Sequence, residues 1–183
     1  MHPADIVRIV KAVPAIAGRL GASEPGRRMS PGERATLRRL DPANPENGIG
    51  AVCRLLLACG VEIERLDAPA LRRVALAVHF QALLSGSGAD PQAPVRAGAG
   101  LVQAGLSEGR FRRFLTARGP AFDDQIPRLA RFLAGRGQRL DARPLVELIL
   151  LGGEDGSRAE DIRLILARDY YFALGKERDP QAA

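Results

Sequence analysis

Side chains that could act as nucleophiles, general bases or metal ligands are few in this chain. The sequence has two histidines, His2 and His79, and two cysteines, Cys53 and Cys59. The cysteines are six residues apart, so they point in different directions on a helix, and no CxxC pair is present. His79 lies inside a long apolar run, where a histidine is typically structural. These residues predict no catalytic centre, no metal site and no cofactor, and we expect a protein without enzymatic activity.

Two pairs of adjacent carboxylates are the remaining candidates for a cation site. They are Asp123 with Asp124, and Glu154 with Asp155. Adjacent residues on a helix diverge rather than converge on one ion. We therefore interpret both pairs as solvated side chains near helix starts.

Arginine is the other residue type that could do chemistry, through binding rather than catalysis. The formal net charge is +6, the sequence pI is about 10.3, and Lys11 and Lys176 are the only lysines. The planar guanidinium binds phosphate oxygens bidentately, and a basic surface attracts nucleic acid. Genomic base composition is the alternative source of the arginine enrichment. The charge alone does not decide between the two.

The arginines are spaced as short ridges on expected helices. The candidate phosphate-binding residues are Arg34, Arg38, Arg39, Arg72, Arg110, Arg113, Arg128 and Arg131. Several pairs are three or four residues apart and lie opposite apolar faces, so we expect them to reach a phosphate chain without disturbing the fold. Ion pairing with neighbouring carboxylates on a solvated face is the alternative for each of them. Aromatic residues make up only 4% of the chain, which argues against a module that stacks bases in series.

Helices that position these residues are indicated along the whole chain, because apolar residues recur at helical spacing and sustained strand-like alternation is absent. We expect helices over about 4–20 (kinked or split at Pro14), 31–40, 49–59, 68–84, 95–104, after Ser107, around 126–133, and over 141–151 and 161–174. Helix starts are indicated by Ser30 with Glu33, Asp67, Ser107, Asp141, and Ser157 with Glu160.

The predicted fold is all-α: a two-lobed helical bundle of about eight helices. The lobes are residues 1–84 and 95–183, and 85–94 form a linker or flexible loop rich in Gly and Pro. The apolar runs are too short to span a membrane, and the N-terminus lacks the pattern of a signal peptide. We interpret Cys53 and Cys59 as buried reduced thiols and expect a cytoplasmic protein.

Three segments resemble the small subunit of the type I-E CRISPR surveillance complex Cascade, the CasB family. The first is G-E-R-A-T-L-R-R at 32–39, the second S-E-G-R-F-R-R-F-L-T-A at 107–117, and the third A-R-D-Y-Y at 167–171. Their order and the chain length also agree with the family. The family often has a tryptophan where this chain has Ala142.

The resemblance implies a non-catalytic subunit that binds nucleic acid. Such subunits are helical, are usually present as a dimer, and contact the backbone and large subunits of Cascade. They stabilise the hybrid of CRISPR RNA with target DNA, and the displaced strand, through arginine–phosphate contacts. The resemblance implies these contacts for Arg34, Arg38 and Arg39, and next for Arg110 and Arg113. A structural helical adaptor that binds protein partners, with a basicity due to composition, is the alternative.

Overall fold

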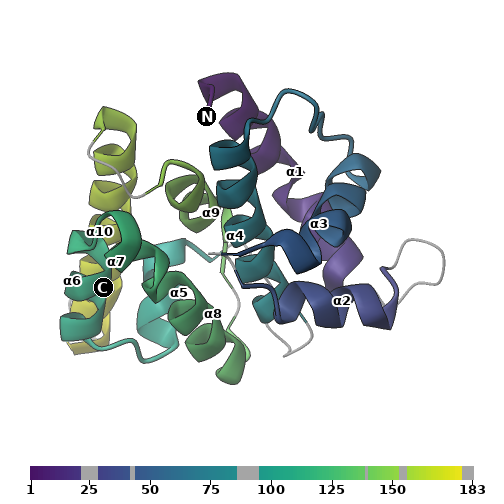
Figure 1. Ribbon diagram of the computed structural model, residues 1–183. Coiled ribbons are helices and arrows are strands. Elements are labelled where there is room, and N and C mark those ends of the chain that lie inside the picture. Colours follow the sequence, from purple (N-terminus) through teal and green to yellow (C-terminus); the bar gives the residue numbers. More distant parts are fainter. Residues whose placement is uncertain (22–28, 42–43, 86–94, 139, 153–155, 179–183) are drawn as a thin grey trace.

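The protein is described by a computed structural model over residues 1–21, 29–41, 44–85, 95–138, 140–152 and 156–178 (Figure 1). These residues form ten α-helices and no β-strand, which confirms the all-α class. The first four helices are α1 (Pro3–Gly21), α2 (Pro31–Arg38), α3 (Glu46–Ala58) and α4 (Ala68–Leu84). The others are α5 (Ala97–Gln103), α6 (Glu108–Thr116), α7 (Gly119–Asp123), α8 (Gln125–Gly135), α9 (Arg143–Leu150) and α10 (Ser157–Arg178). The short helix α7 is the one that the sequence did not indicate.

Two of the predicted helix starts have the expected cap. Ser30 Oγ accepts a hydrogen bond from the Glu33 amide at 3.2 Å, and the Glu33 carboxylate accepts one from the Ser30 amide at 3.1 Å. This reciprocal capping box fixes the start of α2. At α4, the Asp67 carboxylate accepts from the Ala70 amide at 2.8 Å. Both predictions are confirmed.

The other three starts differ from the prediction in whole or in part. Ser107 is the N-cap of α6, as predicted, but its side chain accepts no capping hydrogen bond. Ala142, not Asp141, is the N-cap of α9, and the Asp141 carboxylate binds the amide and guanidinium of Arg143. Helix α10 begins at Ser157 itself, so that residue is helical rather than a cap. At α9, Arg143 competes for the Asp141 carboxylate, which a pattern of caps alone does not show.

Helix α1 is not split at Pro14. The helix continues from Pro3 to Gly21 and buries Ile9, Val13 and Ile16, while Pro14 stays exposed. Burial of this apolar face outweighs the one hydrogen bond that proline cannot donate. The correction matters for the core, because one unbroken helix packs against both α4 and α9.

Helix α4 is the centre of the fold. It packs against α1, α2 and α3 on one side and against α8 and α9 on the other (Figure 1). Nearly every residue from Val74 to Leu84 is buried, which confirms the prediction of a central helix. His79 is 1% exposed and its Nδ1 atom is 2.8 Å from the Leu37 carbonyl oxygen, so it is a structural residue.

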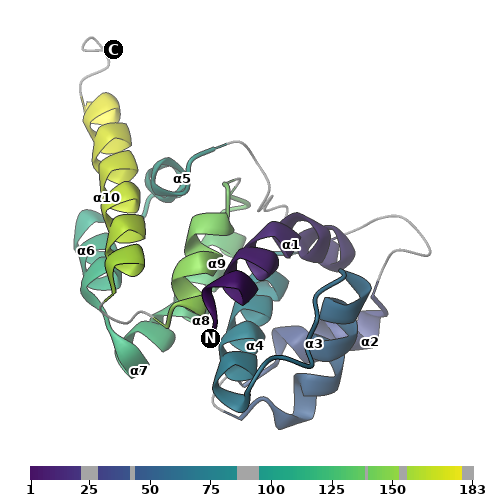
Figure 2. The same cartoon turned by 90° about the horizontal axis from the view of Figure 1, so that it is seen from above.

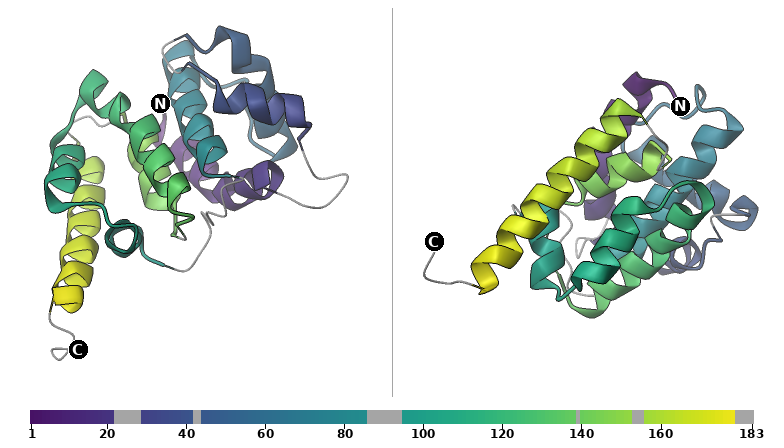
Figure 3. Two further views of the ribbon diagram at one scale, coloured as in Figure 1. Left: turned by 90° about the horizontal axis from the view of Figure 1, so that it is seen from below. Right: turned by 90° about the vertical axis from the view of Figure 1, so that its left-hand side faces the viewer.

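Helix α10 is the longest and lies at the edge of the molecule farthest from α2 and α3 (Figure 2). It packs closely against α5, which crosses it (Figure 3). Gly98 permits this crossing, since a Cβ atom there would be 2.5 Å from the Leu166 carbonyl oxygen and 2.6 Å from the Tyr170 nitrogen.

The division into two lobes stays a prediction. The buried hydrophobic residues of both halves form one contiguous cluster, with α8 and α9 against α4. Residues 86–94 of the predicted linker lie outside the described residues, and Ser85 is the C-cap of α4.

Cys53 and Cys59 are free thiols but are half-buried rather than fully buried, and burial raises the pKa of Cys59.

Candidate nucleic-acid interface

Helix α2 and its C-cap carry three of the predicted arginines in three different environments. Arg39 is exposed and ends the helix as its C-cap. Arg34 is half-buried, and its Nε atom is buried without a hydrogen-bond partner. Arg38 donates from Nε to the Ala82 carbonyl oxygen at 3.1 Å and from Nη2 to the Ser85 carbonyl oxygen.

Arg38 therefore satisfies carbonyl groups at the C-terminal end of α4, where no further turn of helix does so. This corrects the expectation that every arginine of this ridge is free to bind phosphate without affecting the fold. Its positive charge also lies at the negative end of the α4 dipole. The contact is between α2 and the central helix, so Arg38 contributes to stability whatever else it binds.

A groove of about 750 Å³ lies where α2, α4, α7 and α8 meet, and we call it the arginine groove. Its charged lining residues are Arg39, Asp41, Arg72, Arg73, Asp123, Asp124, Arg128 and Arg131. Four of the predicted arginines are among them, although up to 92 residues separate them in sequence. The packing of α8 on α4 brings them together.

One arginine of this groove is already neutralised. Arg73 forms an ion pair with Asp123, and both side chains are partly exposed. The expectation that Asp123 is merely solvated is wrong: this carboxylate holds Arg73 at the start of α8, facing α4. Asp124 is exposed and is the N-cap of α8, although its side chain accepts no capping hydrogen bond.

A second cavity, the α6–α8 pocket, adjoins the groove and has a volume of about 380 Å³. Arg110 and Arg113 line it from α6, and Arg128 and Asp124 line both this pocket and the arginine groove. Because the two cavities share residues, six of the eight predicted arginines lie along one continuous path. The path runs from the end of α2 across α4 and α8 to α6. Arg34 and Arg38 do not line either cavity.

These six side chains carry unpaired charge. All are exposed, and none forms an ion pair or a side-chain hydrogen bond with another residue in the described ranges. Other arginines are paired with carboxylates, namely Arg8, Arg54, Arg65, Arg73, Arg96, Arg118, Arg143, Arg158, Arg163 and Arg168. The alternative that these arginines form ion pairs with neighbouring carboxylates therefore does not hold for the six side chains of the path. An anion can bind them without displacing an existing ion pair.

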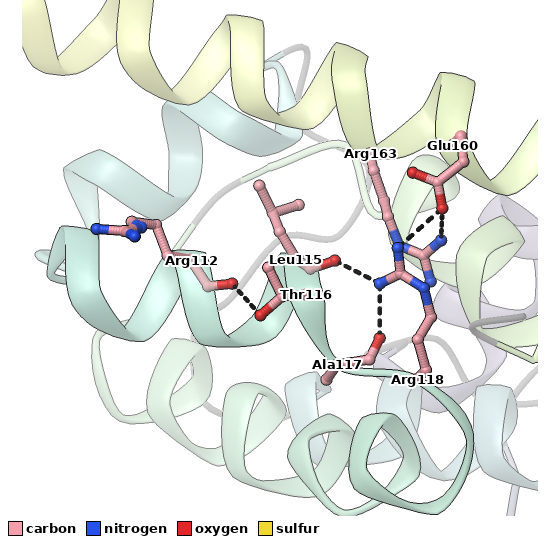
Figure 4. A network of polar contacts seen from close by, with 7 residues as sticks. All are labelled: Arg112, Leu115, Thr116, Ala117, Arg118, Glu160 and Arg163. Carbon is pink, nitrogen blue, oxygen red and sulfur yellow. Dashed lines mark hydrogen bonds and ion pairs between the residues drawn. The ribbon is translucent and has the colours of Figure 1, made fainter. Parts of the chain in front are cut away.

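Helix α6, which presents the second ridge, is held against α10 by a polar network (Figure 4). Arg118 donates to the Leu115 and Ala117 carbonyl oxygens at 2.9 and 3.0 Å, and to the Glu160 carboxylate at 2.9 Å. Arg163, on α10, is 4% exposed and pairs with the same carboxylate. The network fixes the C-terminal end of α6 and uses its carbonyl groups.

Aromatic packing holds the other end of α6. The Phe111 and Tyr170 rings stack with centroids 3.8 Å apart, and the Tyr170 hydroxyl donates to the Leu106 carbonyl oxygen at 2.6 Å. Asp169, beside Tyr170, is nearly buried and accepts hydrogen bonds from Arg96 and Arg168. The A-R-D-Y-Y segment thus supports α6 through the ring and hydroxyl of Tyr170.

Sequence reasoning did not show how two residues contribute to this region. Asp124 is exposed, as expected, but it lines both cavities of the arginine path, and Arg73 enters the groove as a neutralised pair. Local spacing carries no signal for either, because both depend on how α4 and α8 pack. Arg112 is a further exposed arginine of α6 without an ion pair, but it lines neither cavity. No group of three or more metal-ligating side chains occurs among the described residues, and none of the helices there is long and apolar enough to cross a membrane.

The family model for the CRISPR-associated protein Cse2 matches residues 33–171. The chain belongs to the Cse2 family. The match begins in the first turn of α2 and ends in α10, so it contains the arginine path and leaves out α1. Comparison with curated proteins and with solved structures finds no match.

Membership of the Cse2 family implies that this chain is a subunit of the CRISPR Cascade complex. It is then part of one assembly with the other subunits of that complex. This confirms the resemblance seen in the three sequence segments. Two of those segments have distinct positions in the structure. The segment at 32–39 contributes Arg39 to the arginine groove, and the segment at 107–117 contributes Arg110 and Arg113 to the α6–α8 pocket.

Proposed function

We propose that this chain holds nucleic-acid backbone inside Cascade. Its ligands are the hybrid of CRISPR RNA with target DNA and the displaced DNA strand. The supporting observation is the path of six unpaired arginines, because exposed guanidinium groups without carboxylate partners suit a chain of phosphates. Helices with separate origins in the sequence converge on that path. Composition alone would scatter arginines over the surface.

The path can bind backbone without reading sequence. Each phosphate that is neutralised releases condensed counterions, so the binding energy depends on salt and not on base identity. Exchange of a DNA duplex for an RNA–DNA hybrid is nearly neutral in free energy, and protein contacts to the backbone can therefore stabilise the open state. We propose that the chain acts by such contacts in the cytoplasm and catalyses no reaction.

A structural adaptor is the second candidate function, and one observation favours it. Helix α10 exposes four large hydrophobic side chains, Leu164, Ile165, Tyr171 and Phe172, with exposed fractions of 41–68%. Exposed apolar side chains grouped on one helix are typical of protein contacts. The two functions are compatible, since a subunit also contacts its neighbours, and we propose that two copies of the chain assemble in the complex.

The test of the proposed function uses assembled Cascade carrying Arg39→Gln and Arg72→Gln. We expect normal assembly but fewer complexes with an open target, measured by permanganate reactivity of the displaced strand. The matched control is Lys11→Gln with Arg65→Gln, which removes the same charge outside the two cavities. Equal reactivity of the two doubly substituted complexes would contradict the proposal. Loss of the chain from the complex by Phe172→Lys, with DNA binding by the free chain intact, would assign α10 to the adaptor role.

A further inference from the structure

The floor of the α6–α8 pocket is apolar. Leu106, Phe114 and Leu129 form it and are 7%, 3% and 6% exposed, and Phe132 adds a half-buried ring. A phosphate gains nothing from such a floor. The volume of the α6–α8 pocket, about 380 Å³, falls within the usual range of small-ligand pockets, about 300–1,000 Å³. A flat or compact apolar group is the kind of ligand that fits this floor.

The rim supplies charge on one side and acceptors on the other. Arg110, Arg113 and Arg128 are exposed and unpaired. Gln125 donates from Nε2 to the Arg113 and Ala121 carbonyl oxygens at 3.3 and 3.4 Å, which leaves its Oε1 atom as an acceptor. The Asp124 carboxylate is a second acceptor in the lining.

We propose that this pocket takes one nucleobase of a single-stranded segment whose flanking phosphates lie on the rim arginines. The proposal rests on the proposed function, since it needs a phosphate chain on the same path. A nucleotide is the ligand that combines a flat apolar ring with adjacent negative charges. The continuity with the arginine groove through Arg128 favours a polynucleotide over a free anion. A paired base cannot enter, because it remains stacked within its duplex.

The acceptors of the rim also select among bases. Exocyclic amino groups of cytosine, adenine and guanine donate hydrogen bonds, whereas the exocyclic groups of thymine and uracil accept them. With Asp124 and Gln125 Oε1 as acceptors, the pocket favours a base that carries an amino group. One such base does not conflict with the low aromatic content, because a single pocket needs no series of stacking platforms.

The pocket can be filled without touching an arginine. Ala121 is exposed on α7 and lines the pocket, so Ala121→Trp places a ring where the base would lie. Ala15→Trp is the matched control, because Ala15 is exposed on α1 and lines neither the pocket nor the groove. Thermal unfolding of both variants checks that the fold is intact, and Ala121→Leu replaces Ala121→Trp if it is not.

The experiment is a calorimetric titration of the full chain at low salt with three probes: a cytidine tetranucleotide, a thymidine tetranucleotide, and the cytidine probe with one internal base removed. We expect the intact cytidine probe to bind roughly fivefold or more tightly than the abasic one, the scale of one base–aromatic contact. The thymidine probe should be intermediate. Ala121→Trp should reduce cytidine-probe affinity to the abasic level, and Ala15→Trp should not.

Three results would overturn the inference in distinguishable ways. Equal, salt-dependent binding of the intact and abasic probes would leave the arginine–phosphate function standing and exclude the base. Absence of binding by any probe would contradict the proposed function itself. If Ala121→Trp releases the chain from Cascade while probe affinities stay unchanged, the pocket holds a side chain of a neighbouring protein instead.

Discussion

The Nε atom of Arg38 donates a hydrogen bond to the Ala82 carbonyl oxygen across 3.1 Å, and this contact joins the second helix of the chain to the end of the central one. Arg39, the next residue, has an exposed side chain that lines the arginine groove. Two adjacent arginines of one motif therefore have different physical roles. One satisfies carbonyl groups of the protein, and the other remains available to an anion.

This difference predicts different effects of the same substitution at the two positions. Arg38→Gln removes the charged donor from the end of α4 and should lower the free energy of unfolding by about 1–2 kcal/mol. Arg39→Gln should leave stability unchanged, because the Arg39 side chain forms no hydrogen bond or ion pair with the other described residues. Urea denaturation followed by circular dichroism measures both. Equal midpoints for the two variants would show that the Arg38 hydrogen bonds contribute nothing to stability.

The fold was largely predictable from sequence because its signals are local. The Ser30–Glu33 capping box, the Asp67 cap and the apolar run from Val74 to Leu84 each depend on neighbours within a few residues. Pro14 shows the limit of such reasoning, since its helix stays whole only because α4 and α9 cover its apolar face.

The candidate site was predictable residue by residue but not as a surface. Helical spacing identified Arg72 and Arg128 separately, and only the packing of α8 on α4 places them in one groove. The same packing pairs Asp123 with Arg73, 50 residues away in sequence. A ridge pattern also does not show that the Arg38 side chain donates to carbonyl groups at the end of α4.

A prediction about packing concerns Gly98, where α5 crosses α10. A methyl group there would meet backbone atoms of Leu166 and Tyr170 within 2.6 Å, so Gly98→Ala should destabilise the protein by about 1–3 kcal/mol. Gly18, in α1, has open space around its Cβ position, and Gly18→Ala should instead be neutral or stabilising by up to about 1 kcal/mol. Thermal unfolding compares them, and a stable Gly98→Ala variant would show that the two helices can separate freely.

The pH dependence of stability tests the burial of His79. Burial lowers the pKa of His79, the Arg131 charge lowers it further, and the Leu37 hydrogen bond and Asp41 oppose the shift. The unfolded chain binds a proton with a pKa of about 6.5, so the folded state is favoured above that pH and loses stability as the pH falls below it.

His79→Asn keeps a donor near the Leu37 carbonyl oxygen but cannot titrate. We expect the drop in the free energy of unfolding between pH 7.5 and 5.5 to be smaller in this variant than in the natural protein, whatever its stability at pH 7.5. Chemical denaturation at the two pH values measures the drop. An identical drop in both proteins would mean that other groups account for it.

Asp124 interrupts the arginine path with a negative charge that repels phosphate. Asp124→Asn should therefore strengthen binding of single-stranded DNA by about twofold to fivefold at low salt, the scale of one screened charge at close range. Asparagine is an equally good N-cap, so α8 should remain stable. Glu177→Gln changes the net charge equally from the far end of α10, where the residue is exposed and outside both cavities. Equal gains in DNA affinity in the two variants would show that the effect comes from net charge alone.

The salt dependence of single-stranded DNA binding tests the central claim most directly. The comparison is between Arg128→Gln with Arg131→Gln, which removes two unpaired charges of the path, and Arg65→Gln with Arg158→Gln, which removes two ion-paired ones. We predict that the first double variant binds more weakly at every salt concentration, with a log–log slope shallower by roughly 0.7 for each phosphate that is no longer neutralised. The second should keep the slope of the natural protein. Parallel lines for both variants and the natural protein would contradict the account, because the arginine path would then bind no phosphate.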